Sequence, residues 1–136
     1  MAGTTNMMRV IAVSGLAALF AYTLNRLVVA RSGDSAVKLL VPVMEESLKT
    51  GFALAFAVSV PLVHMGFGMY EAVYDFFANP EVGKHRRYLA ALLAFLGHAI
   101  FGWLTWVVLE LRLAALLAIM VVGAMHICWN TLVLAR

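Results

Sequence analysis

Several side chains that can do acid–base chemistry stand inside long apolar stretches of this chain. They are Glu45, Glu46, Lys49, Glu71, His98, His126 and the amide Asn130. A charged group near the centre of a bilayer costs about 2.5–3.5 kcal/mol on insertion scales, so we expect a functional reason for each one. Carboxylates and imidazoles in a low-dielectric pocket can activate water, and an imidazole with an amide can stabilise an oxyanion. Alternatively, one carboxylate and two imidazoles form a zinc site that keeps a position open for water.

Four of these groups fall at similar depths when each predicted helix is measured at 1.5 Å per residue. Glu45 lies roughly 12 Å from its helix end at one membrane face, and Glu71 lies roughly 10 Å from an end at the same face. His98 and His126 lie roughly 16 Å and 15 Å from that face. Because helices of alternating direction bring these groups to one level, we expect them to share a single site.

Local spacing supports the same site. Glu45 and Lys49 are four residues apart and share a helix face, so we expect them to form an ion pair. His126 and Asn130 have the same spacing and present an imidazole and an amide to one cavity. Small residues that let helices approach closely flank Glu71 and His98. They are Gly66, Gly68, Gly97 and Gly102.

The composition predicts the elements that hold these residues. The 136 residues are 64% hydrophobic and 12% charged, whereas soluble domains are roughly a quarter charged. A chain this short cannot bury so much apolar surface in its own core, so the lipid bilayer must solvate the remainder. We expect an all-α, polytopic transmembrane helical bundle that forms a single domain over residues 1–136. Its five predicted spans are residues 8–30, 36–60, 62–77, 88–109 and 113–134.

The basic residues predict an orientation for an integral, multi-pass protein. Arg26, Arg31 and Lys38 flank the first connection, the polar loop 79–87 carries three more basic residues, and Arg136 ends the chain. The positive-inside bias therefore places the C-terminus and this loop in the cytoplasm. The net charge of +3 is too small and too scattered to predict a nucleic-acid partner.

Four short motifs resemble, in order, those of the PrsW-type intramembrane proteases. They are EESLK at 45–49, GFGMYE at 66–71, GHAIFG at 97–102 and HICWN at 126–130. The first is similar to the EExxK motif, the second to GFAxxE, and the last to HxxxN. The wider group includes the CAAX prenyl endopeptidases, whose first motif usually has arginine where this chain has Thr50.

The resemblance implies an intramembrane endopeptidase whose substrate is a membrane protein or a lipidated peptide. It assigns catalysis to Glu45, Glu46, His98, His126 and Asn130. Lys49 and Glu71 are implied as supporting residues. The PrsW-type branch is classed as metalloprotease, which would place zinc on Glu45, His98 and His126, whereas the prenyl-protease relatives resemble metal-independent glutamate proteases. The chain departs from the family pattern at Ala72, where asparagine is usual, and at Tyr74, which stands one position early.

Other interpretations stay open at this point. The chain could be a non-catalytic scaffold that assembles with a membrane partner subunit, or a transporter subunit that relays protons through its buried carboxylates. We expect His64 to be structural or interfacial, Asp75 to be interfacial, and Cys128 to be buried in a span without a base. Arg9 followed by an apolar run imitates a signal peptide, but no small-residue cleavage pattern closes the run, so we expect the first span to be retained.

Overall fold

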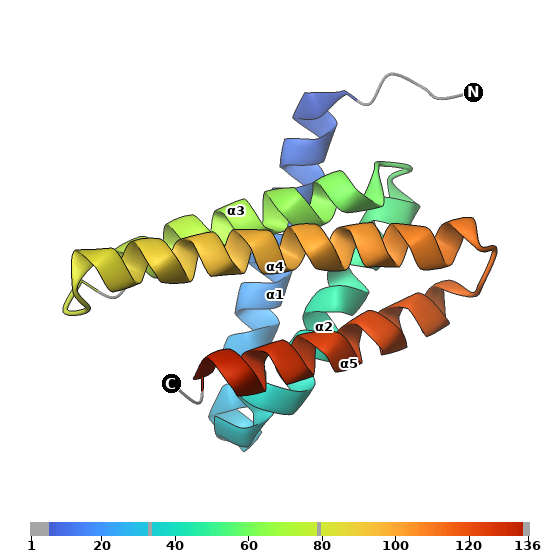
Figure 1. The fold of residues 1–136 in the computed structure, drawn as a ribbon. Coiled ribbons are helices and arrows are strands. Elements are labelled where there is room, and N and C mark those ends of the chain that lie inside the picture. The colour runs from blue at the N-terminus through green and yellow to red at the C-terminus, as the bar shows by residue number, and fades with distance from the viewer. Residues whose placement is uncertain (1–5, 33, 79, 135–136) are drawn as a thin grey trace.

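The computed structural model describes residues 6–32, 34–78 and 80–134. This part of the chain contains five α-helices and no strand (Figure 1). They are α1 (Met7–Ser32), α2 (Asp34–Ala55), α3 (Val60–Ala78), α4 (Lys84–Glu110) and α5 (Ala115–Leu134). The predicted all-α class is confirmed.

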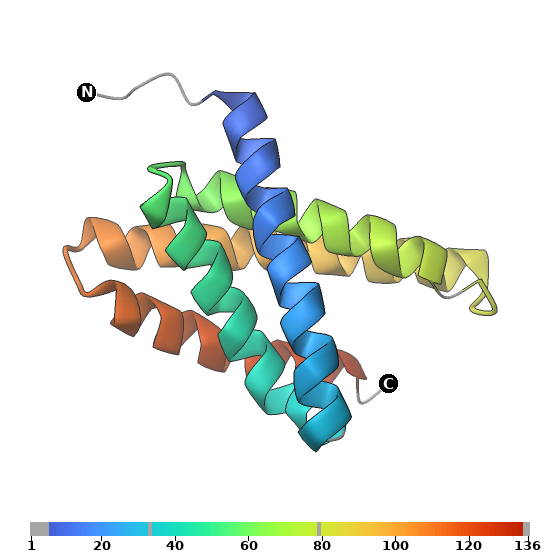
Figure 2. The same ribbon diagram turned by 180° about the vertical axis from the view of Figure 1, so that it is seen from behind.

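The helices form two layers that cross one another. Helices α3, α4 and α5 run side by side in alternating directions, and the hairpin of α1 and α2 lies across them (Figures 1 and 2). Helix α2 packs against α1, α3 and α5, and α1 also packs against α3. The middle of each helix therefore lies near the crossing of the layers, which is where residues from distant parts of the sequence can meet.

Three of the described helices are long and apolar enough to cross a membrane. They are α1, α4 and α5, the last over residues Ala115–Leu132. Large apolar side chains on their outer surfaces are exposed, including Leu19, Leu92, Trp103 and Met120. Such extensive exposed apolar surface is typical of lipid contact. Helices α2 and α3, which carry Glu45, Glu46, Glu71 and Asp75, are not among these three helices.

Helix α2 ends earlier than the predicted span, which ran to residue 60. Ala57 has a φ of 49°, and the backbone N–H of Val58 donates to the carbonyl of Ala53 at 2.9 Å. A left-handed residue with this bond is the usual way of ending a helix and satisfying its last carbonyls. Arg9 on α1 donates to the Phe56 carbonyl at 2.8 Å and fixes the same turn.

The basic segment that we predicted as a loop lies mostly in a helix. Lys84, His85, Arg86 and Arg87 occupy the first turns of α4, and only Pro80–Gly83 remain as a described connection. Residue 79 at the start of the predicted loop lies outside the described residues, as do Gly33 and the chain end at 135–136.

Two glycines allow α3 and α4 to approach closely, as predicted. A Cβ atom on Gly68 would lie 2.8 Å from Cβ of His98. A Cβ atom on Gly102 would lie 2.5 Å from Cβ of His64, so this glycine accommodates a different histidine from the one we expected. Both distances are shorter than side-chain packing permits. The two glycines thus set how near each histidine stands to the opposing helices.

Candidate active site

Helix α2 contributes the most deeply buried polar groups. Glu46, Lys49 and Thr50 are spaced i, i+3 and i+4, so they share one face, and all three are fully buried. Lys49 Nζ lies 2.5 Å from Glu46 Oε1. The predicted ion pair between Glu45 and Lys49 is therefore wrong: both carboxylates are buried, and Lys49 contacts that of Glu46. Burying two charges is costly, so such a pair persists only when hydrogen bonds satisfy both partners.

His126 on α5 contacts the same carboxylate, that of Glu46. Its Nδ1 lies 2.9 Å from Glu46 Oε1, an oxygen that already accepts a hydrogen bond from Lys49. Because a carboxylate oxygen in this setting can only accept, His126 Nδ1 must be the donor. In the neutral imidazole, Nε2 then carries the lone pair. Nε2 lies 4.0 Å from Glu45 Oε2, so this lone pair faces a second carboxylate.

His98 on α4 is held in the opposite tautomer. Lys49 Nζ lies 2.9 Å from His98 Nδ1, and an ammonium group has protons to donate but no lone pair to accept. His98 Nδ1 is therefore the acceptor, and its proton sits on Nε2. That N–H donates to Glu71 Oε2 on α3. His98 thus presents a donor and His126 presents an acceptor.

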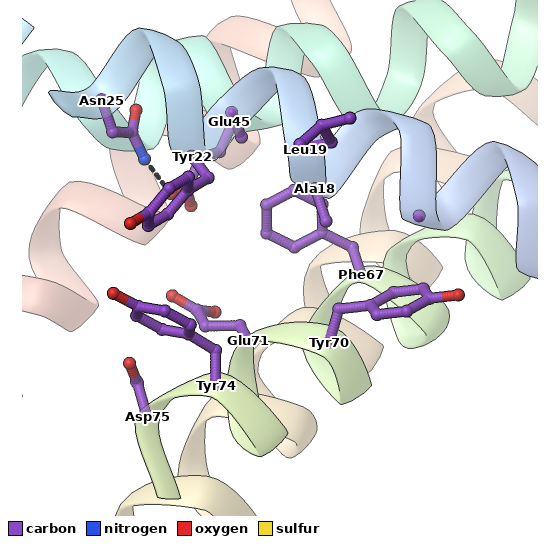
Figure 3. Close-up of a pocket in the computed structure, with 12 residues that line it drawn as sticks. Ala18, Leu19, Tyr22, Asn25, Glu45, Phe67, Tyr70, Glu71, Tyr74 and Asp75 are labelled. Carbon is purple, nitrogen blue, oxygen red and sulfur yellow. Dashed lines mark hydrogen bonds between the residues drawn. The ribbon is translucent and has the colours of Figure 1, made fainter. Parts of the chain in front are cut away.

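Helix α1 supplies a site residue that the sequence did not reveal. Asn25 Nδ2 donates to Glu45 Oε1 at 2.8 Å (Figure 3). Since one oxygen of Glu45 is held by this amide, the other, Oε2, is left to face His126. The signal in the sequence was the amide itself, which interrupts an otherwise apolar run.

His64 on α3 is the second residue that sequence reasoning placed elsewhere. We expected it to be structural or interfacial, and its fully buried side chain excludes the interfacial alternative. Its Nδ1 lies 3.5 Å from Glu46 Oε2, and its Nε2 lies 3.3 Å from Thr50 Oγ1. His64 therefore belongs to the same polar cluster as the α2 residues.

Two cavities meet at the carboxylates. The first, of about 390 Å³, opens between α1 and α3, and Figure 3 shows Glu71, Tyr74 and Asp75 facing Tyr22 and Asn25 across it. The second, of about 360 Å³, extends toward α4 and α5. Four residues line both cavities: Asn25, Glu45, Glu71 and Asp75. These side chains therefore stand at the junction of two spaces that a ligand could enter.

The remaining predicted site residues divide between the second cavity and the protein interior. The second cavity is lined by His98, His126 and Asn130, whereas Glu46 and Lys49 line neither cavity. Glu46 and Lys49 can therefore position other groups but cannot touch a ligand there. All seven predicted residues lie in or beside one cluster.

Cys128 is exposed rather than buried. It stands two residues from both His126 and Asn130, which at 3.6 residues per turn is the far side of α5.

The predicted zinc ligands lie close together. One ligand atom each from Glu45, His98 and His126 falls within 4.8 Å of the others. Ligands of a tetrahedral zinc ion stand about 2.0–2.2 Å from the metal, so the three side chains would have to draw inward. His98 would also have to exchange a partner, because Lys49 occupies its Nδ1 and Glu71 its Nε2. With these hydrogen bonds in place, the three side chains do not form a ready tetrahedral zinc site.

Comparisons of the chain with models of known protein families, with curated proteins and with solved structures found no match. The function proposed below is therefore argued from the site itself and from the motifs that its residues form.

Proposed function

We propose that this protein is an intramembrane endopeptidase, a hydrolase that cleaves peptide bonds of membrane-embedded or membrane-anchored substrates. One observation carries the proposal. Glu45 Oε2 and His126 Nε2 face one another at 4.0 Å, and both residues line the second cavity. A hydrogen bond from Asn25 holds Glu45, and a hydrogen bond to Glu46 holds His126. Two fixed acceptors at this separation are suited to orient one water molecule.

Glu45 is the general base in this mechanism. A water that donates one hydrogen bond to Glu45 and one to His126 attacks the carbonyl carbon of the scissile bond, and its proton passes to Glu45. The tetrahedral intermediate collapses as the C–N bond breaks. Glu45 then returns the proton to the leaving nitrogen, so that one water yields a carboxylic acid and an amine.

The hydrogen bonds favour a different division of roles between the histidines from the one that the motifs led us to expect. The spacing of His126 and Asn130 suggested these two residues as the oxyanion donors. The tautomers support His126 as the partner of Glu45 and His98 as a donor. The amide of Asn130, which lines the same cavity as His98, is the group we assign to the oxyanion. His98 keeps its Nε2–H on Glu71 and so orients that carboxylate.

The two cavities fit a substrate that lies across the carboxylates. Glu45 and Glu71 stand at their junction, so a chain bound with its scissile bond there extends into both. The first cavity is walled by small residues of α1 and by aromatic residues of α3, namely Gly15, Ala18, Ala21, Phe67 and Tyr70. Such a wall accepts apolar side chains, which is what a membrane segment offers.

We also propose that all five helices lie in the membrane. Apart from Lys38 near the start of α2, the ionisable residues described on these two helices are buried or line the cavities. The exposed large apolar side chains of α2 and α3 include Leu39, Leu54, Met69 and Phe77. Lipid can therefore contact α2 and α3 as it contacts the three longer apolar helices. The basic residues at the start of α4 support placing the 79–87 segment and the C-terminus in the cytoplasm.

Cleavage of a defined peptide set tests the proposal. Purified protein in liposomes is incubated with a pool of single-span peptides, and the products are identified by mass spectrometry. We expect discrete cleavage within the membrane segment, lost in Glu45→Gln and kept in Glu110→Gln, a matched change at an exposed carboxylate at the end of α4. Equal cleavage by the Glu45→Gln protein would refute the assignment. A co-purifying membrane subunit without turnover would favour the scaffold interpretation.

A further inference from the structure

His64 is a fully buried imidazole for which the mechanism above has no use. It lines neither cavity, so it cannot touch a substrate bound there. It nevertheless stands against the polar face of α2. Gly102 on α4 makes room for it, since a Cβ atom there would lie 3.0 Å from Cγ of His64. An imidazole placed in the protein interior among charged groups is expected to form hydrogen bonds with them.

The contacts of Glu46 show which of its atoms His64 can bond. Glu46 Oε1 accepts from Lys49 and from His126. Its other oxygen, Oε2, is buried, and within the described residues no hydrogen bond reaches it or His64 Nδ1. These two atoms lie 3.5 Å apart, so a shift of a few tenths of an ångström closes a normal N–H···O bond between them.

The carboxylate of Glu46 indicates which nitrogen of His64 carries the proton, because Oε2 faces Nδ1 and can only accept. Thr50 is placed to bond the other nitrogen. Its hydroxyl lies 3.3 Å from His64 Nε2 and can donate to a lone pair there. With Nε2 accepting from Thr50, the proton of the neutral ring sits on Nδ1 and points at Glu46 Oε2. The chain of donors then runs from Thr50 through His64 to Glu46, and both carboxylate oxygens are held.

We propose that His64 is a positioning residue that fixes the orientation of the Glu46 carboxylate group. In that orientation Glu46 Oε1 accepts from His126 Nδ1–H and so keeps His126 in the Nδ1–H tautomer. The inference rests on the proposed function of the site, because its consequence for catalysis is that the lone pair of His126 stays directed at Glu45. Lys49 and His126 both bind Oε1 of Glu46, so neither restrains the other oxygen. His64 is what prevents the carboxylate from rotating away from His126.

Nuclear magnetic resonance of the imidazole nitrogens tests this without any substrate. Histidine-labelled protein in nanodiscs reports each ring's tautomer through the ¹⁵N shifts of Nδ1 and Nε2. In the wild type we expect Nδ1–H for both His64 and His126. His64→Leu removes the donor and should shift His126 toward a mixture of tautomers. His64→Asn places an amide N–H near the position of Nδ1 and should restore the wild-type pattern.

A control separates positioning from packing. Val63→Ala changes a fully buried neighbour of His64 and should lower thermal stability while leaving the His126 tautomer intact. Unchanged His126 shifts in His64→Leu would overturn the proposal. So would a His64 that carries its proton on Nε2 in the wild type, a result that needs no variant to fold.

Turnover adds an independent readout. On a peptide that the wild type cleaves, His64→Leu should lower kcat by about 10- to 100-fold, as is usual for residues that orient a catalytic group, with KM unchanged. His64→Asn should recover most of that loss, and equal kcat in wild type and His64→Leu would contradict the role. If the wild type cleaves nothing, the proposed function fails, yet the tautomers still decide what His64 does to Glu46.

Discussion

Among the described residues, Lys49 is the one lysine or arginine that is buried in the polar cluster. The effect of its removal on the free energy of unfolding can be worked out from its contacts. Its side chain is 0% exposed, and it donates to Glu46 Oε1 at 2.5 Å and to His98 Nδ1 at 2.9 Å. Methionine has a similar shape, so Lys49→Met leaves little cavity. It does leave the buried carboxylate of Glu46 without its cation. Breaking a buried pair in this way costs about 3–5 kcal/mol.

Removing the negative charge as well should return part of that free energy. In Lys49→Met/Glu46→Gln, the amide oxygen of Gln at position 46 still accepts from His126, and no charge remains unpaired. What remains lost is the donor to His98 Nδ1, and an unsatisfied buried acceptor costs about 1–3 kcal/mol. Both variants lose that donor, so the double variant should be more stable than the single variant by about 3–5 kcal/mol, the cost of the unpaired charge.

Equilibrium unfolding in mixed micelles, followed by circular dichroism, measures both differences. The matched control is Lys38→Met, which changes an exposed lysine of the same helix and should leave the free energy of unfolding near the wild-type value. The reasoning is refuted if Lys49→Met is as stable as Lys38→Met. It is also refuted if the double variant is no more stable than the single one, because the buried charge would then not be the source of the cost.

Three further predictions follow from the contacts around the carboxylates. Asn25→Leu should lower kcat by about 10- to 100-fold, because Glu45 loses the amide that orients it, and steady-state kinetics with wild-type kcat would contradict that role. Gly68→Ala should lower stability by about 1–3 kcal/mol, since its Cβ would lie 2.8 Å from His98 Cβ. Gly51→Ala, which meets nothing within 4 Å, should be neutral or stabilising, and thermal unfolding that fails to separate the two variants would count against the close packing. Peptide cleavage should survive strong chelators because both nitrogens of His98 are already bonded, and zinc at one equivalent, lost together with activity on chelation, would show a metal enzyme instead.

The sequence predicted that the site residues come together better than it predicted which of them contact one another. Glu45, His98 and His126 each stand near the middle of a helix, and the middles meet where the two layers cross (Figure 2). Equal distance of these residues from the helix ends therefore predicted correctly that they meet. That prediction assumed helices lying side by side, whereas two of the helices cross the other three. The partner of Lys49 was mispredicted because i, i+3 and i, i+4 neighbours share a face equally well. Only packing against the other helices decides which one points inward.

Asn25 and His64 were missed for reasons of geometry. Asn25 stands near one end of a long apolar helix, where a polar residue usually meets the membrane interface. The packing of α1 against α2 in the hairpin brings it instead to Glu45. His64 lies in the early turns of α3, just after the tight turn that ends α2, which sets it against Thr50. Neither the register of α1 against α2 nor the turn has a signature in the pattern of apolar residues.

The most direct test of the central claim is isotope incorporation during cleavage. A membrane-embedded peptide that the protein cuts is incubated with it in water enriched in ¹⁸O, and the new C-terminus is weighed by mass spectrometry. The account predicts that one ¹⁸O enters the new carboxylate in a single turnover and that Glu45→Gln forms no product. Cleavage without ¹⁸O, or cleavage with ¹⁸O that is undiminished in Glu45→Gln, would show that Glu45 does not activate the water.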